Sequence, residues 1–420
     1  MTVHAIEAVA AAIGTLFLVI ARPRGLNEGI AALIGGAVVL LLGLVSPAGA
    51  LRLESGTWNV FLFFLGMMGI AGLADQSGVF DLVAVAVARL AHGRVLVLYV
   101  AVFALGALIS ILFANDSAAL VLTPIVYALV LRLSLDPLPF VFATTFIADT
   151  ASIALPVSNP LNVIVADGFH LGLGAYVAHL WLSALLVIIV NLLVFLILFR
   201  RGLRGRFERL PDPVQRPGVA STFALLVAVA VAYLIASALQ APLGLVALAG
   251  AAALGLNLLR LRALDSQRLA REISWPIFGF IAGMLLVVQG LDNSGVTAAL
   301  GHTLAGAAGG SHLSAIAVAT VGTAVGSNLI NNLPMSLVMV HTVQPLHVAP
   351  AIRQNLVYGT ILGCDLGPNL THLGSLATFI WLFFLRRKGL EVSTWDYFRI
   401  GILTTPLMLV AAIVGLSLTS

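Results

Sequence analysis

Charged residues are scarce in this chain of 420 residues. They make up 9% of it, whereas a soluble domain carries about 25%, and 60% of the chain is hydrophobic, with a mean hydropathy of +1.10. This composition excludes an ordinary soluble protein and favours a polytopic membrane protein. The net charge is only +4, so the chain has no basis for nucleic-acid binding.

Cysteine is nearly absent as well. The single Cys364 excludes a disulfide framework or a multi-thiolate metal site within one chain, and we interpret it as a structural packing residue. No GxxxxGKS motif is present, so we expect no ATP hydrolysis by the chain itself, no cofactor and no enzymatic activity. The first apolar run follows no Lys or Arg, which favours a retained helix over a signal peptide.

The chain does contain an internal repeat. The segment 58–79 reads WNVFLFFLGMMGIAGLADQSGV, and 275–296 reads WPIFGFIAGMLLVVQGLDNSGV, with 9 of 22 positions identical. In a membrane protein such duplication is typical of a secondary transporter whose site lies where the repeats meet. We expect an N-terminal repeat over 1–202, a basic cytoplasmic linker over 203–217 and a C-terminal repeat over 218–420.

Apolar segments of membrane-spanning length predict the fold class. We expect an all-α polytopic membrane protein, with ten transmembrane helices plus two re-entrant hairpins in two inverted-topology repeats. The hairpins cover 95–133 and 312–350, with polar tips at Asn115-Asp116 and Asn331-Asn332; two ordinary spanning helices are the alternative for each. The expected spans are 5–21, 28–46, 58–74, 139–168, 176–199, 219–239, 241–259, 276–291, 352–385 and 399–418.

The basic residues predict the orientation. If the stretch from Arg200 to Arg216, with its six arginines, is cytoplasmic, 19 of the 21 basic residues fall on that side, and only Arg52 and Arg353 fall outside. Both termini are then expected outside. The count supports the inverted orientation, but it is the same whether the hairpins re-enter or span.

Two buried carboxylates are the main functional candidates. Asp149 and Asp365 lie within apolar spans at an offset of 216, and ionisable groups at membrane depth are functional hypotheses by default. We assign them, with the unmatched hairpin-tip Asp116, to proton coupling. Asp75 and Asp292 end a span in a DxSG pattern, and we interpret them as cap or turn residues.

An irregular stretch follows each of the two carboxylates, where Pro156, Pro160 and Pro368 break the helix. Helix breaks expose backbone groups that bind solutes. Two breaks and two hairpin tips therefore predict a polar cage near the midplane, although a tip asparagine alone could simply cap a hairpin arm. His372 lies in the second break as a structural or a titrating residue. The expected substrate-binding residues are Asn115, Ser158, Asn159, Asn162, Asn331, Asn332, Gly374, Ser375 and Thr378.

The cage contains no Lys or Arg, which disfavours a strongly anionic substrate. Its amides, hydroxyls and backbone groups suit a small neutral polyhydroxyl solute, or a cation if the carboxylates are charged. Energy must then come from an ion gradient or from a partner, and a carboxylate that binds and releases a proton couples the two fluxes.

At these residues the chain resembles the ArsB-type arsenite/antimonite efflux transporters of the ion-transporter superfamily. The resemblance covers essentially the whole chain, in FANDSAALVLTPIV (113–126), FIADTASIALPVSNPLNVIVAD (146–167), NNLP (331–334) and GCDLGPNLTHLGSLATFIWL (363–382). It implies ten spans with two opposed hairpins, and export of arsenite or antimonite in exchange for protons from the bacterial inner membrane. Some members also associate with a soluble ATPase subunit.

Two departures bear on the site chemistry. Typical members carry Lys at the position of Asn369 and Pro at that of His372. Arsenous acid is a neutral trihydroxy species, and one cysteine cannot give the multi-thiolate coordination that As(III) prefers, so we predict recognition by oxygen atoms and hydrogen bonds.

Three alternatives remain open from the residues. A Na⁺/H⁺ antiporter of the same superfamily would use Asp116, Asp149 and Asp365 as its cation site. A dicarboxylate or citrate carrier would hold carboxylates at the Ser/Asn tips and at Ser158-Asn159. A non-transporting membrane receptor is disfavoured by the duplicated polar breaks.

Overall fold

The computed structural model describes residues 2–113, 115, 122–208, 218–239, 241–371, 374–375, 378, 381–382, 385 and 388–420. Within these residues the chain is helical, with no β-strand; one isolated bridge pairs Arg94 with Arg206. Asp116 and His372, singled out from the sequence, lie outside the described residues.

The described helices fall into two series in chain order. The first series consists of α1 (Val3–Ala21), α2 (Glu28–Leu41), α3 (Pro47–Gly56), α4 (Trp58–Ser77), α5 (Val79–Leu90), α6 (Val95–Phe113), α8 (Thr123–Arg132), α9 (Pro137–Ala151), α10 (Pro160–Phe169) and α11 (Leu173–Leu198). The second consists of α12 (Val219–Ala238), α13 (Leu243–Arg260), α14 (Ser266–Glu272), α15 (Pro276–Asn293), α16 (Val296–Ala308), α17 (His312–Ile330), α18 (Asn332–Val343), α19 (Pro350–Leu366) and α21 (Thr394–Thr419).

The all-α polytopic class is confirmed. Ten helical segments in the described part are long and apolar enough to cross a bilayer. They are not the same ten as the expected spans. The helices α6 and α17, which we assigned to hairpins, qualify by length, whereas α2 has only 14 residues and α19 only 17.

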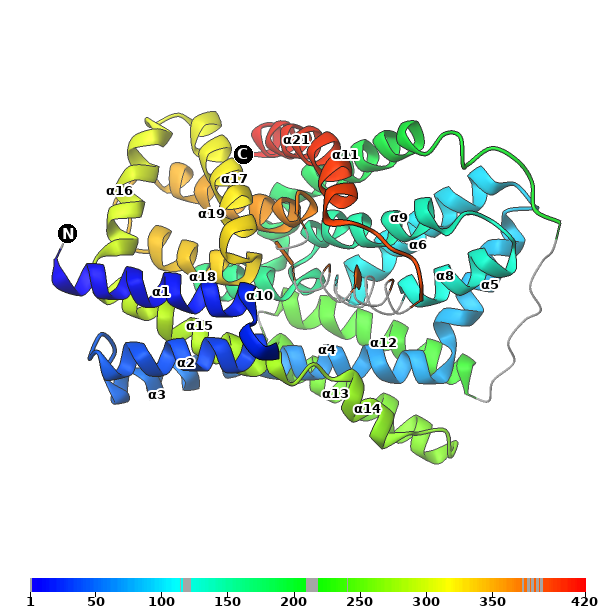
Figure 1. The fold of residues 1–420 in the computed structure, drawn as a ribbon, viewed down its shortest axis with the longest axis horizontal. Helices are drawn as coiled ribbons and strands as arrows, with labels where there is room; N and C mark the ends of the chain where they lie inside the picture. The colour runs from blue at the N-terminus through cyan, green and yellow to red at the C-terminus, as the bar shows by residue number, and fades with distance from the viewer. Residues whose placement is uncertain are drawn as a thin grey trace.

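The described helix in the second arm of each hairpin is short. The helix α8 has 10 residues and α18 has 12. At 1.5 Å per residue they extend about 15–18 Å, whereas the hydrocarbon core is about 30 Å thick. The arm that contains α18 therefore cannot cross the bilayer as a helix, which favours the re-entrant form for the second hairpin. The start of the arm that contains α8 lies outside the described residues. Figure 1 shows α5 and α8 at one end of the molecule and α16 at the other.

The two repeats pack against each other through two pairs of helices, each with one helix from each repeat. The helix α2 lies against α15, and α13 lies against α4, so each partner comes from the other repeat. A Cβ added at Gly283 would lie 2.2 Å from the backbone of Ala32, and one added at Gly66 would lie 2.3 Å from the backbone of Ala247. Small residues let membrane helices approach closely, so this identical Gly pair of the repeat marks two equivalent crossings.

The directions of these helices support inversion. Gly29 lies against Pro276 and Gly36 lies against Gly283, so α2 and α15 run in the same direction. Only the 10-residue helix α3 joins α2 to α4, which makes α2 and α4 antiparallel if both cross the membrane. It follows that α4 and α15, which carry the repeated motif, run in opposite directions.

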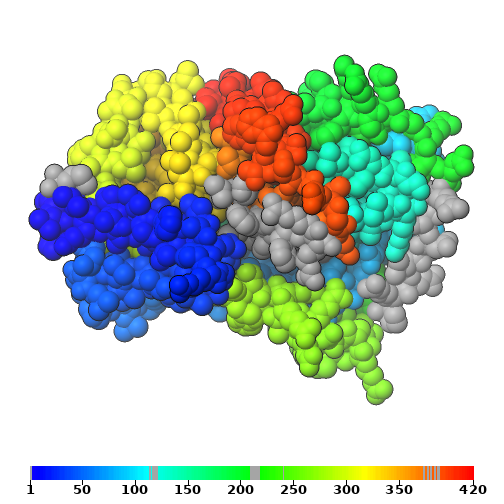
Figure 2. Space-filling view, in the orientation of Figure 1, coloured from blue at the N-terminus to red at the C-terminus, as the bar shows by residue number. Residues whose placement is uncertain are grey.

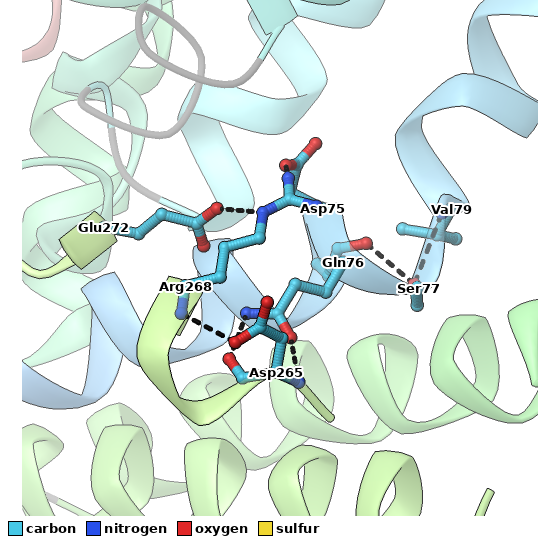
Figure 3. A network of polar contacts seen from close by, with 8 residues as sticks. Asp75, Gln76, Ser77, Val79, Asp265, Arg268 and Glu272 are labelled. Carbon is cyan, nitrogen blue, oxygen red and sulfur yellow. Dashed lines mark hydrogen bonds and ion pairs between the residues drawn. The ribbon is translucent and has the colours of Figure 1, made fainter. Parts of the chain in front are cut away.

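The end of α4 is tied to α14, which lies along one edge of the molecule (Figures 2 and 3). Arg268 pairs with Asp75 and donates from Nε to Glu272 Oε1 at 2.6 Å. The predicted turn is present, since the Gly78 N–H donates to the Asp75 carbonyl at 2.9 Å. The Asp75 side chain, however, forms this ion pair between the repeats. The DxSG pattern in the sequence did not reveal that interaction.

The equivalent end of α15 is held differently. The Asp292 carboxylate accepts from Thr297 Oγ1 at 2.5 Å, five residues later, so the side chain does stabilise the turn there. It also lies 3.4 Å from His341 Nδ1 on α18. The two aspartates of the repeat therefore share a turn but not a partner.

The most enclosed helices are those that carry the predicted site. All residues from Pro139 to Ala151 in α9 are buried, and so are all residues from Asn355 to Leu366 in α19. By contrast, only 17% of the apolar window of α1 is buried. A helix that is buried on every side lies inside the bundle, so α9 and α19 form the centre and α1 lies at the lipid-facing edge.

Candidate functional site

The first helix break follows Asp149. The helix α9 ends at Ala151 and gives way to two short 3-10 turns, Ser152–Ala154 and Pro156–Ser158, with Leu155 extended between them. Asn159 then caps α10, because its Oδ1 accepts from the Leu161 N–H at 3.2 Å. Pro160, the first residue of α10, lacks an N–H and suits that position. This is the broken helix that the sequence predicted.

The second break follows Asp365. There α19 ends at Leu366 and a 3-10 turn, Gly367–Asn369, contains Pro368. Asn328 of α17 donates from Nδ2 to the Gly367 carbonyl at 2.7 Å, and the Asn332 N–H donates to the Gly374 carbonyl at 3.0 Å. The second hairpin therefore contacts the second break on both sides of its tip.

Asp365 joins the two repeats. Its side chain is fully buried, and its Oδ1 accepts from Ser152 Oγ at 2.8 Å and from Asn159 Nδ2 at 2.6 Å. Both donors belong to the first break, more than 200 positions earlier in the chain. Among the described residues, Asp365 Oδ2 has no hydrogen-bond partner. This carboxylate therefore couples the second broken helix to the first.

Asp149 is bound within its own repeat. It is 1% exposed, and Asn115 at the first hairpin tip donates from Nδ2 to Asp149 Oδ1 at 2.9 Å. In the part of the chain that the structure describes, Asp149 and Asp365 are the two buried carboxylates, and no Lys or Arg is buried.

A third group of polar side chains surrounds Thr150. Asn191 of α11 donates from Nδ2 to Thr150 Oγ1 at 2.9 Å, and Asn369 of the second break donates to the same atom at 3.4 Å. Thr150 in turn donates to the Phe146 carbonyl at 2.7 Å. Asn369 thus lies between the repeats. Sequence reasoning missed Asn191, although a lone asparagine in the 26-residue apolar helix α11 was the available signal.

Several predicted substrate-binding residues hold the backbone of the breaks. Ser158 Oγ donates to the Ile111 carbonyl at 2.8 Å, and Asn162 Nδ2 donates to the Ser152 carbonyl at 2.9 Å. Asn331 has a φ of 75° and accepts at Oδ1 from the Leu333 N–H at 3.3 Å, so it caps α18. These contacts are structural, and they shape the cage in the present conformation.

The remaining predicted residues line the second break. Gly374 lies so close to Pro368 that an added Cβ would be 2.5 Å from the Pro368 Cα. Ser375 and Thr378 are buried. Of these residues, Gly374 is the one that contacts the turn after Asp365, and the Asn332 N–H donates to its carbonyl.

Comparison with known proteins identifies the family. The sequence model described as "Arsenical pump membrane protein" matches residues 7–419. The chain is also 35% identical over 417 residues to the arsenical pump membrane protein of Escherichia coli K12, with 96% of each chain covered. That of Yersinia enterocolitica is 35% identical over 413 residues, with 96% of each covered.

The chain belongs to the arsenical pump membrane protein family.

Solved structures agree with this fold. The YdaH transporter of Alcanivorax borkumensis superimposes with a TM-score of 0.57 at 17% identity, covering 89% of each chain. MtrF of Neisseria gonorrhoeae, described as one of a class of antimetabolite efflux pumps, gives a TM-score of 0.51 at 14% identity, covering 89% of this chain and 85% of that one. At such low identity the likeness concerns the fold, which is that of a membrane transporter rather than a soluble enzyme.

Within the described part of this family member, no three His, Cys, Asp or Glu side chains lie together in a way that could hold a metal ion. Cys364 is fully buried in α19, directly before Asp365 and beside Ser327 and Thr323 of α17. The site that the structure does assemble consists of hydroxyls, amides and two carboxylates. Such a set can donate and accept hydrogen bonds, and its carboxylates can bind a proton.

Proposed function

We propose that this protein exports arsenite or antimonite from the cytoplasm in exchange for protons. The observation that carries the proposal is the Asp365 carboxylate, which is fully buried and accepts hydrogen bonds from Ser152 and Asn159 of the other repeat. A buried ionisable group at a repeat interface is suited to couple protonation to a movement of the repeats. Membership of an arsenical pump family supports the choice of substrate.

The donor and acceptor set suits a neutral hydroxylated solute. The cage offers amides such as Asn115 and Asn159, hydroxyls such as Ser152, and the carbonyls of broken helices. Neutral arsenous acid has three hydroxyl groups, each able to donate and to accept. Its recognition therefore needs neither a buried cation nor a thiolate, and none of the described Lys and Arg residues is buried.

Protonation changes what Asp365 can do. The ionised carboxylate only accepts hydrogen bonds, whereas the protonated form also donates one. Ser152 Oγ and Asn159 Nδ2 both donate to Oδ1 of this carboxylate. A proton that arrives from outside removes its negative charge and so weakens the hydrogen bonds that join the two helix breaks. When these hydrogen bonds break, the site opens toward the outside and the substrate leaves. Release of the proton to the cytoplasm lets the hydrogen bonds form again. Asp149 and Asp116 belong to the same proposed proton pathway, together with the amide of Asn115.

The test uses everted membrane vesicles from a bacterial host that lacks its own arsenite exporter. Wild type is expected to accumulate arsenite when the lumen is acidified, and collapse of the pH gradient by a protonophore should abolish the uptake. Asp365→Asn and Asp149→Asn should each abolish or uncouple the proton-driven component. Asp265→Asn, at the surface cap of α14, is the matched control and should behave as wild type. A wild-type pH dependence in both Asp365→Asn and Asp149→Asn would refute their proton role.

The same host separates the alternatives. Rescue of growth on arsenite supports the proposal, whereas rescue on high sodium alone would assign the site to a Na⁺/H⁺ antiporter. Uptake of citrate or a dicarboxylate by purified protein in liposomes would favour the carrier alternative. Liposomes driven only by a pH gradient also show whether transport needs the soluble ATPase partner that some relatives use.

The proposed location is the bacterial inner membrane, with both termini outside and the linker 203–217 in the cytoplasm. The strongly biased distribution of basic residues supports this orientation. In this orientation the α12–α13 turn and the C-terminal end of α10 face outward.

A further inference from the structure

A pocket of about 210 Å³ lies between α10 of the first repeat and the turn from α12 to α13 of the second. One face of α10 lines it at helical spacing, through Val163, Ala166, Asp167 and His170. The other lining residues are Pro156, Leu171, Ser237, Ala241 and Leu243. The pocket therefore lies at an interface between the two repeats, outside the set of residues already assigned to the cage.

The pocket extends along α10 from the helix break. Pro156 begins the 3-10 turn that ends one residue before Asn159, the donor to Asp365. Asp167 is eight residues beyond Asn159 on α10, which corresponds to about 12 Å at 1.5 Å per residue. A solute leaving the cage along α10 would therefore meet Asp167 near the outer end of that helix.

The Asp167 carboxylate is held in place by a neighbouring helix pair. Asn59 of α4 donates from Nδ2 to Asp167 Oδ2 at 2.8 Å, and its own Oδ1 accepts from the Gly244 N–H of α13 at 2.8 Å. The amide is therefore fixed at both ends. A carboxylate has about four acceptor positions, so the hydrogen bond from Asn59 leaves most of its capacity for a ligand.

The pair formed by Asn59 and Asp167 has no equivalent in the sequence of the second repeat. The offset of 217 places Asn59 opposite Pro276, and the offset of 216 places Asp167 opposite Phe383, so neither polar residue has a polar counterpart. The pair thus distinguishes the outer half of the path from the inner half. A carboxylate repels anions, and it accepts readily from the hydroxyl groups of a neutral solute.

We propose that this pocket is an outer release subsite for the neutral hydroxylated substrate, in which Asp167, oriented by Asn59, accepts a hydrogen bond from a substrate hydroxyl. The inference rests on the proposed function, because it takes arsenous acid as the solute. It assigns to Asp167 a substrate-binding role on one side of the membrane, separate from proton coupling at Asp149 and Asp365.

The test measures arsenite exchange from each side of the membrane separately. Right-side-out vesicles expose the outer pocket to the medium, and everted vesicles expose the cytoplasmic side. In Asp167→Asn we expect the half-saturating arsenite concentration to rise about tenfold in right-side-out vesicles, as for loss of one charge-assisted hydrogen bond, and to stay at the wild-type value in everted ones. Asn59→Ala should give a smaller shift on the same side.

Asp136→Asn is the matched control, because Asp136 caps the opposite end of the same broken helix and asparagine caps equally well. It should leave both values at wild type, and size-exclusion profiles should match for all variants. An equal shift on both sides, or on neither, would overturn the subsite while wild-type exchange still upheld the transport function. Stimulation by sodium that is lost in Asp167→Asn would also overturn it, in favour of a cation. Absence of arsenite exchange by wild type would refute the proposed function itself.

Discussion

Asp149 and Asp365 occupy equivalent positions in the two repeats but bind different partners. Asp149 accepts from Asn115 of its own hairpin, whereas Asp365 accepts from Ser152 and Asn159 of the other repeat. The symmetry mates of Ser152 and Asn159 are Pro368 and Ser375, so the second break cannot offer Asp149 the same pair of donors. The two repeats therefore differ at the centre of the proposed site, although they are related by the duplication.

The residue Cys364 provides a test of thiol-free recognition. We expect Cys364→Ser to retain arsenite uptake in everted vesicles, because serine is nearly the same size as cysteine and its hydroxyl lies beside those of Ser327 and Thr323. Cys364→Ala separates loss of the thiol from insertion of a hydroxyl, which the neighbouring Ser327 and Thr323 could bind. Loss of efflux from a folded Cys364→Ser protein would instead assign arsenite coordination to the thiol.

At the scale of elements, two helix pairs formed between the repeats hold the repeats together. The pair α2–α15 and the pair α4–α13 cross at Gly283 and Gly66, where the neighbouring backbone leaves no room for a side chain. These pairs also carry Asn59 and Gly244, which bind each other beside the outer pocket. The repeated sequence motif therefore encodes the frame against which the broken helices are positioned.

This frame predicts the effect of adding one methyl group at a crossing. Gly66→Ala and Gly283→Ala should each destabilise the protein by about 1–3 kcal/mol, because overpacking forces the helices apart. Gly322→Ala on α17 is the control, since an added Cβ meets nothing within 4 Å there. It should be neutral or stabilise the helix by up to about 1 kcal/mol. Melting temperatures in detergent measure all three, and equal values would contradict the close crossings.

At the scale of the whole molecule, the inverted arrangement determines which side each mouth of the pathway faces. Figure 1 shows α5 and α8, which adjoin and end the first hairpin, at one end of the molecule, and α16, which precedes the second hairpin, at the other end. With the basic linker in the cytoplasm, the pocket beside Asp167 faces outward. The orientation is therefore part of the proposed mechanism.

Reporter fusions test this orientation. Alkaline phosphatase fused after Ser420 should be active, and a fluorescent protein inserted in the linker 203–217 should fluoresce, since each reporter works on one side only. A fluorescent protein fused after Ser420 is the control and should remain dark. The reverse pattern would place the Asp167 pocket in the cytoplasm, although the packing of the two repeats would be unaffected.

Much of the fold could be predicted from the sequence because its signals are local. Apolar length indicates spans, prolines indicate breaks, and the repeated motif indicates two units. Both breaks lie where these signals put them, and so does the tip of the second hairpin, where Asn331 separates α17 from α18. The predictions for Asp116 and His372 fall outside the described residues, and the substrate roles of the cage residues stay predictions.

Other features could not be predicted because they depend on packing between distant segments. The sequence indicated that Asp75 lies in a turn, but not that Arg268 is its partner. It marked Asp365 as functional, but it did not indicate that Asn159 donates to this carboxylate, nor that Asn59 donates to Asp167.

The sequence by itself therefore determined the membrane class, the duplication, the positions of the breaks and the family. Each of these depends on composition or on spacing along the chain. Only the tertiary structure decided which side chains meet Asp149, Asp365 and Asp167, because each of those contacts joins residues that are at least 34 positions apart in the chain. A hydrogen bond between residues 206 positions apart, as between Asn159 and Asp365, has no local signature, and it forms because α10 of one repeat packs against α19 of the other.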